Sequence, residues 1–165
     1  MKPMPTTARV SIRHEDFDLS DEVAALRADD ARVGAVATFT GTVRDRHGAQ
    51  QGIQALELEH YPGMTEAALE SMIDEAQRRF DILGARIVHR VGRLAPTDQI
   101  VLVAVSSAHR SEAFQACEFL MDYLKTQAPF WKKERTDQGE RWVDARVADD
   151  EALRRWGIEA GNAQA

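Results

Sequence analysis

The sequence contains a single cysteine, Cys117, and no apolar run approaches the roughly 20 residues that a membrane-spanning helix needs. One cysteine excludes an internal disulfide and a thiolate-rich zinc site, and it agrees with a reducing compartment. Residues 1–7 lack the apolar segment of a signal peptide. We therefore expect a cytoplasmic protein that does not enter a membrane, with residues 1–7 as a flexible leader.

An excess of positive charge is also missing. The chain has 21 Lys and Arg against 27 Asp and Glu, which gives a formal charge of −6. A protein that binds nucleic acid mainly through its phosphates needs the opposite balance, so binding to RNA or DNA is not expected. The acidic residues gather in segments 15–30 and 144–151, however, and this leaves room for a cationic pocket elsewhere.

Several signatures of catalysis are absent. The sequence has no G-x-G-x-x-G, no P-loop and no G-x-S-x-G. Four histidines show no paired spacing of metal ligands, so we expect structural or surface roles for them and no metal site: His14, His47, His60 and His89. Cys117 lies on the apolar stripe of a predicted helix and is expected to be an inert core thiol.

What is present is a mixture of hairpin-like strand patterns and helix patterns in a chain of 165 residues, a length that fits one compact domain. Residue alternation and β-branched runs predict strands over 8–14, 33–43, 53–60, 85–92 and 99–106, with a loop at 44–52 and a turn at 94–98. Helices are predicted after a Ser20 cap and over 65–80, 109–125 and 149–156, the last within a C-terminal tail at 147–165. A hairpin is predicted over 131–146, and the mixture indicates an α+β fold.

The 109–125 helix is expected to bury one apolar stripe and to carry an anion site at its start. The stripe residues are Phe114, Cys117, Leu120, Met121 and Leu124. At the start, free backbone N–H groups join His109 and Arg110, a combination that suits phosphate. The alternative is a serine cap followed by two polar residues that face solvent.

Lys125 and Lys132 flank the helix-stopping Pro129 and two aromatic residues. A partly desolvated lysine loses its proton below the ordinary pKa of about 10.4 and serves as a base, nucleophile or proton donor. The alternative is a helix-terminal lysine favoured by the dipole and an exposed strand lysine. A weaker candidate lies at 40–44, where Gly41 lets a ligand come close to the backbone and Arg44 could bind an anion. The alternative is a loop arginine that faces solvent.

Five segments together resemble the large, catalytic subunit of molybdopterin synthase. They are TFTGTVR (38–44), LELEHYPGM (56–64), SAHRSEAF (107–114), MDYLKTQAPFWKKE (121–134) and RWVDAR (141–146). The resemblance covers roughly residues 33–146. It implies an α/β-hammerhead-type fold with a mixed or antiparallel sheet and an additional hairpin subdomain. It also implies a homodimer of large subunits within a heterotetramer, with a small ubiquitin-like sulfur-carrier subunit at each end.

The resemblance further implies a sulfurtransferase that needs no cofactor of its own. The carrier's C-terminal thiocarboxylate would supply the sulfur, and cyclic pyranopterin monophosphate would be converted to the dithiolene of molybdopterin. By the same resemblance, Lys125 and Lys132 form the catalytic pair. The implied substrate contacts are Thr42, Val43, Arg44, His109, Arg110, Lys125, Lys132, Lys133 and Glu134.

One expectation comes from helix geometry. His109 and Lys125 are sixteen residues apart, so one continuous helix would separate their Cα atoms by about 24 Å. A small substrate cannot span that distance. We therefore predict that each pocket takes Lys125 and Lys132 from one subunit and His109 with Arg110 from its dimer mate. A non-catalytic module that uses the same cations to bind a phosphate or a partner's C-terminal tail is the rival function.

Overall fold

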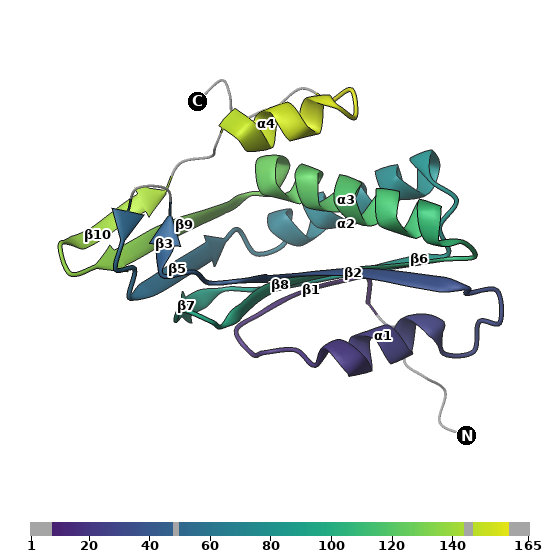
Figure 1. The fold of residues 1–165 in the computed structure, drawn as a ribbon, viewed down its shortest axis with the longest axis horizontal. Coiled ribbons are helices and arrows are strands. Elements are labelled where there is room, and N and C mark those ends of the chain that lie inside the picture. The colour runs from purple at the N-terminus through teal and green to yellow at the C-terminus, as the bar shows by residue number, and fades with distance from the viewer. Residues whose placement is uncertain (1–7, 48–49, 144–146, 159–165) are drawn as a thin grey trace.

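The computed structural model describes residues 8–47, 50–143 and 147–158. Its first sheet has four strands in the order β1-β6-β8-β2 (Figure 1). These strands are β1 (Val10–Arg13), β6 (Gly84–Arg90), β8 (Gln99–Ser107) and β2 (Ala35–Thr42). β1 pairs with β6 in parallel and the other pairs are antiparallel, so this sheet is mixed.

The second sheet is antiparallel and has the order β10-β9-β5-β7. Its strands are β10 (Gly139–Val143), β9 (Phe130–Thr136), β5 (Ala55–His60) and β7 (Gly92–Leu94). A further pair joins β3 (Arg46–His47) to β4 (Gln50–Gln51). The α+β class is confirmed, and the predicted hairpin is β9-β10, with residues 144–146 of that prediction outside the described residues.

Helices cover both faces of the mixed sheet (Figure 1). α1 (Leu19–Arg27) lies on one face, while α2 (Met64–Arg79) and α3 (Arg110–Gln127) lie on the other, and α4 (Val147–Arg154) packs over α3. β8 is buried on both sides: Val103 belongs to the core under α2 and α3, and Leu102 belongs to the core that includes Leu26 of α1. β8 confirms the strand predicted over 99–106, and cores on both of its faces make it a central strand. None of the described helices is long and apolar enough to cross a membrane.

The predicted stripe of α3 is correct except at Phe114. Cys117, Leu120, Met121 and Leu124 are buried, whereas Phe114 is 65% exposed. The buried face is centred on Ala116 and Leu120, and at 100° per residue position 114 lies about 140° from that centre, on the exposed side of the helix. Apolar character alone assigned Phe114 to the stripe, whereas its angular position does not.

Three boundary predictions were wrong. The cap of α1 is Asp18, whose Oδ1 accepts a hydrogen bond from the backbone N of Asp21 at 3.0 Å, and Ser20 lies inside the helix. The segment 44–52, predicted as a loop, contains β3 and β4. The three-residue strand β7 was not predicted, because so short a strand has too few residues to show alternation.

Candidate functional site

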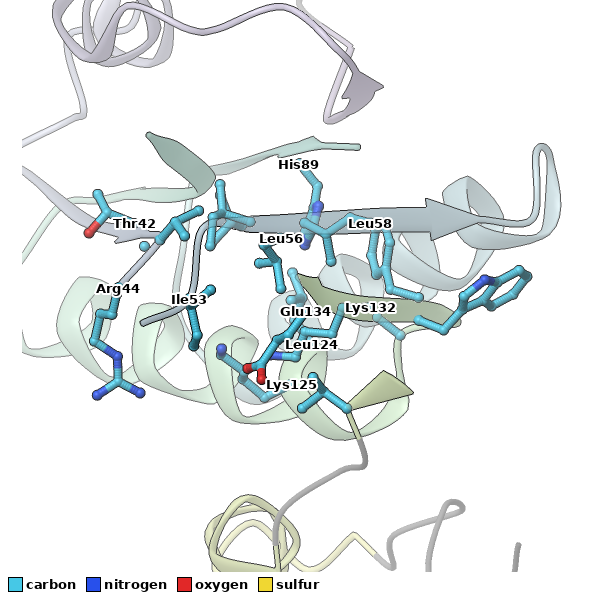
Figure 2. A pocket seen from close by; sticks show the side chains of 18 of the residues that line it. Thr42, Arg44, Ile53, Leu56, Leu58, His89, Leu124, Lys125, Lys132 and Glu134 are labelled. Atoms are coloured by element: carbon cyan, nitrogen blue, oxygen red, sulfur yellow. The ribbon is translucent and has the colours of Figure 1, made fainter. Parts of the chain in front are cut away.

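A cavity of about 460 Å³ opens where the two sheets meet the C-terminal end of α3 (Figure 2). Its walls come from β2, β5, β6, β8, β9 and α3. Six of the residues predicted for the site line this cavity: Thr42, Val43, Arg44, Lys125, Lys132 and Glu134. The structure therefore brings together segments that are up to about 90 positions apart in the sequence.

The connection between α3 and β9 sets the two lysines beside one cavity. Lys125 lies in the last turn of α3, where the helix dipole favours a cation, and Lys132 lies on β9. Pro129 separates the two elements. The buried Thr65 fixes this connection, because its Oγ1 accepts a hydrogen bond from the backbone N of Tyr61 at 3.0 Å and donates one to the carbonyl of Pro129 at 3.1 Å.

Alternation along β9 determines which of its charged side chains reach the cavity. Lys132 and Glu134 are two residues apart and both line it. Lys133 points to the opposite face, where its Nζ lies 3.4 Å from a carboxylate oxygen of Glu140 and 4.8 Å from the ring centroid of Trp142. The side chain of Lys133 is therefore not brought to the cavity.

Glu134 is a buried carboxylate, only 2% exposed. It lies directly opposite Arg141 on β10, whose Nη2 and Nε donate to its Oε2 at 3.1 and 3.3 Å. A buried carboxylate needs such a partner, because desolvation otherwise disfavours its charge. Arg141, which had not been predicted as a site residue, thus holds Glu134 in place.

Positive charge predominates around the cavity even though the whole chain is acidic. Among the described lining residues, one carboxylate, that of Glu134, faces four cationic side chains: Arg44, Arg46, Lys125 and Lys132. Lys132 is half-buried, whereas Lys125 is exposed, so the expectation of partial burial holds for Lys132 and is wrong for Lys125. The cavity is suited to an anionic ligand.

The end of β2 presents Arg44 from an anchored backbone. The backbone N of Val43 donates to the carbonyl of Asp98 at 2.9 Å, and its carbonyl accepts from the N of Thr97 at 2.8 Å. Arg44 itself is exposed and forms no ion pair with any residue that the structure describes. Gly41 also lines the cavity, and a Cβ there would lie 2.9 Å from Cγ1 of Val101, so only glycine fits without displacing this wall.

His109 and Arg110 lie at the other end of α3. His109 is the N-cap residue, Arg110 is the first helical residue, and both are exposed. Neither lines the cavity, and α3 is continuous, so the separation of about 24 Å from Lys125 stands. Ser107 Oγ accepts from the backbone N of His109 at 3.3 Å, but the N-cap is His109 and it makes no side-chain cap bond, so the alternative of a serine cap is wrong while its two solvent-facing polar residues are present. One chain does not bring these residues to Lys125 and Lys132.

The prediction of an ordinary structural role missed His89, which lines the cavity although it is only 5% exposed. Its ring stacks on Phe130 with 3.9 Å between centroids and 17° between planes. Burial lowers the pKa of His89 to about 4, so the imidazole is neutral near pH 7. The alternation of 85–92 contained the signal, since it places position 89 on the same inward face as Ile87.

Cys117 is a buried thiol, and burial raises its pKa to about 11. It is therefore protonated and unreactive near neutral pH, as expected. Across residues 8–47, 50–143 and 147–158, no group of three or more His, Cys, Asp or Glu is arranged to hold a metal ion.

Comparison with known proteins shows the family. The family model described as "MoaE protein" matches residues 12–127. The chain is 60% identical, over 162 residues, to the molybdopterin synthase catalytic subunit of Ralstonia nicotianae, covering 98% of this chain and 90% of that protein. A solved structure, the molybdopterin biosynthesis MoaE protein from Burkholderia ambifaria, is 60% identical, covers 93% of this chain and 100% of that one, and superposes with a TM-score of 0.79.

A chain in the complex of subunits 1 and 2 of molybdopterin-converting factor from Helicobacter pylori has a TM-score of 0.69 at 20% identity, covering 84% of this chain and 92% of that one. That likeness supports the fold alone. The family model and the Ralstonia relative confirm the resemblance found in the sequence motifs. The chain belongs to the family of molybdopterin synthase catalytic subunits, the enzyme subunits that act in molybdenum cofactor biosynthesis.

Proposed function

We propose that the cavity transfers sulfur from the thiocarboxylated C-terminus of a small ubiquitin-like carrier subunit to cyclic pyranopterin monophosphate, forming the dithiolene of molybdopterin. The observation that carries the proposal is that Lys125 and Lys132, from two different elements, line one cation-rich cavity of about 460 Å³. That volume lies within the range of about 300–1,000 Å³ found for small-molecule sites.

Both reactants are anions, and this fits the charges around the cavity. Lys125 and Lys132 hold the thiocarboxylate, stabilise the charge that develops and move protons as sulfur attacks the pterin side chain. Arg44 neutralises the phosphate, because its planar fork matches phosphate oxygens. Thr42, Val43 and Glu134 complete the substrate contacts on the walls that they line.

The source of the sulfur agrees with the chemistry of this chain. Its one thiol, Cys117, is buried and has a raised pKa, so it is a poor nucleophile. A sulfur atom that arrives on a partner removes the need for a reactive thiol here. The carrier's thiocarboxylate fills that role, and no further cofactor is proposed.

We infer that each site is completed by His109 and Arg110 of a second copy of the chain, which place additional positive charge near the phosphate. Their exposure and their distance from Lys125 along a continuous α3 support this. Phe114, one helical turn from Arg110, is 65% exposed and suits a subunit contact. The side chain of Lys133 lies across β9 from the cavity, so its proposed contact with substrate has the weakest geometric support.

The assembly proposed is a homodimer of this chain with one carrier subunit at each end, a heterotetramer. The Helicobacter pylori structure of the same fold is described as a complex of subunits 1 and 2, and we propose the corresponding contact here. We further propose that residues 1–165 form one catalytic domain of the α/β-hammerhead type, with β9-β10 as its additional hairpin, and that the protein is cytoplasmic.

The test is conversion of cyclic pyranopterin monophosphate by purified protein with thiocarboxylated carrier. Lys125→Ala and Lys132→Ala should lower kcat/KM by about 10²–10⁴-fold, the usual contribution of acid–base catalysis, while the carrier complex still forms. Arg135→Ala is the matched control on the opposite face of β9 and should stay within about fivefold of wild type. Turnover that survives both substitutions, or carrier binding that falls in step with turnover, would instead indicate a binding module.

A further inference from the structure

His89 places an unpaired hydrogen-bond acceptor in the cavity wall. Nδ1 lies 2.8 Å from the carbonyl of Arg90, a distance at which it donates its proton to that oxygen. In the neutral imidazole the other nitrogen, Nε2, is then an acceptor. No hydrogen bond to Nε2 is found among the residues that the structure describes, and Figure 2 shows the ring projecting toward the cavity that His89 lines.

The groups that face His89 keep its imidazole uncharged. Burial has the largest effect, and the positive charges of Lys125 and Lys132 and the neighbouring His60 add to it. His60 in turn lies 3.3 Å from Glu66, and Glu134 lies on the same cavity wall as Lys132. His89 therefore contributes a neutral acceptor to the cavity, whereas Arg44, Lys125 and Lys132 contribute cations and Glu134 an anion.

The register of the mixed sheet separates His89 from the anion-binding side. His89 pairs with Val101 on β8, and Val101 pairs with Gly41 on β2, so the three residues form one row across three adjacent strands. At about 4.8 Å between strands, His89 lies about 10 Å from the β2 end of that row, and Arg44 follows three residues later. Between them the wall is apolar, with Val101 and Ile100.

We propose that His89 Nε2 contacts the substrate directly, accepting a hydrogen bond from an N–H or amino group of the pterin ring while the phosphate lies on the Arg44 side of the cavity. The proposal rests on the proposed function and extends it to the orientation of the ring. A ring that presented a carbonyl oxygen to Nε2 would leave two acceptors facing each other, so His89 also selects which edge of the heterocycle points inward.

Three substitutions separate the acceptor from the packing of the ring. His89→Gln places a carbonyl oxygen near the position of Nε2. His89→Asn keeps a donor for the Arg90 carbonyl but has no acceptor at the Nε2 position. His89→Phe keeps the ring volume and the stacking on Phe130 without either nitrogen. Gln and Asn are both small amides, so this pair decides the question even if the phenylalanine variant does not fold.

The measurements are KM and kcat in the complete complex, and calorimetric affinities for cyclic pyranopterin monophosphate, for pterin without a phosphate and for inorganic phosphate. His89→Asn and His89→Phe should raise KM and weaken both pterin ligands about tenfold, with kcat within about threefold of wild type. His89→Gln should stay within about threefold for every ligand. Affinity for inorganic phosphate should not change in any variant.

Wild-type pterin affinity in His89→Asn and His89→Phe would overturn the proposal, and so would an equal loss for inorganic phosphate or an equal loss in His89→Gln and His89→Asn. Failure of the proposed function has a different signature. In that case the wild-type complex itself would not convert the substrate, or Lys125→Ala would turn over normally. If the wild type converts the substrate and the His89 variants bind it as well as the wild type does, only the proposed His89 contact is refuted.

Discussion

The two ends of α3 carry cations into different surroundings. At the C-terminal end, Lys125 meets β9 and the end of β2 around one cavity. At the N-terminal end, His109 and Arg110 are exposed and line no part of that cavity. The same helix thus supplies a lysine to a cavity that its own chain largely builds and, at its other end, two exposed side chains that lie outside that cavity. Lys125 lines a cavity because β9 and the end of β2 lie beside its end of the helix.

The largest expected effect comes from mixing two variants, each of which carries a substitution at a different end of α3. Arg110→Ala and Lys125→Ala should each reduce turnover by about 10²-fold or more when assayed alone. If the ends meet across a dimer, mixing and reassociating the two inactive variants should restore about a quarter of wild-type activity, because half of the dimers are mixed and each contains one intact site.

The control for this experiment is a mixture assayed before subunit exchange, which should remain inactive. Tagging the two variants differently and recovering both on one tag checks independently of activity that the chains exchange. Activity that stays at the level of the separate variants after proven exchange would place all the functional groups within one chain. The two ends of α3 would then not contribute to sites shared between two chains.

The next effect compares two apolar residues of α3 that share one predicted stripe. Leu120→Ala should lower the free energy of unfolding by about 2–5 kcal/mol, because Leu120 is 0% exposed and its removal leaves a cavity. Phe114→Ala should change it by less than about 0.5 kcal/mol in the isolated chain. Urea unfolding at low protein concentration measures both. Equal losses would mean that position 114 is packed against its own chain.

Lowering the pH should reduce the free energy of unfolding, because the pKa of the buried His89 is lowered in the folded chain. Its pKa is about 4 in the folded chain against an ordinary 6.5, so between these values the unfolded chain takes up a proton that the folded chain does not. The free energy of unfolding therefore falls as the pH drops from 6.5 toward 4, by about 3 kcal/mol over the window. His89→Gln should lose this part of the slope in urea unfolding curves. Parallel slopes for the two proteins would contradict it.

The smallest effect concerns the two faces of β9. Arg141→Ala should lower the free energy of unfolding by about 1–2 kcal/mol, because it removes the partner on β10 of the buried Glu134 carboxylate. The loss is no larger because the arginine is half-exposed and water partly screens its charge. The matched control is Arg135→Ala, whose partner Glu140 lies 3.9 Å away on the exposed face. Arg135→Ala should lower the free energy of unfolding by less than about 1 kcal/mol. A reversed order of the two losses would show that the ion pair with Arg141 is not what stabilises the buried Glu134.

Local periodicity predicted most of the framework. β8, α2, α3 and the β9-β10 hairpin follow from apolar spacing and from Gly139 and Pro129, since these patterns reflect faces that each element must bury. The lysine pair stood out as a candidate because its two members flank one proline, and its catalytic role is what the family resemblance implies. The exposure of Phe114 was missed because apolar character was read without its angular position, and the Asp18 cap was missed because the choice between two capping residues depends on neighbours in space.

The cavity wall was the hardest part to predict. His89 lies on β6 and Phe130 begins β9, forty-one positions later, and only the meeting of the two sheets stacks their rings. Arg141 likewise became visible only through its register with Glu134. Pairings between sheets are long-range contacts, and no pattern within one segment encodes them.

The hydroxyl of Thr65 has a mechanical consequence. It ties the first turn of α2 to Pro129, at the joint where α3 gives way to β9. Lys125 and Lys132 lie on either side of that joint, so the two hydrogen bonds of one buried hydroxyl anchor the segment that carries both lysines to a third element, α2.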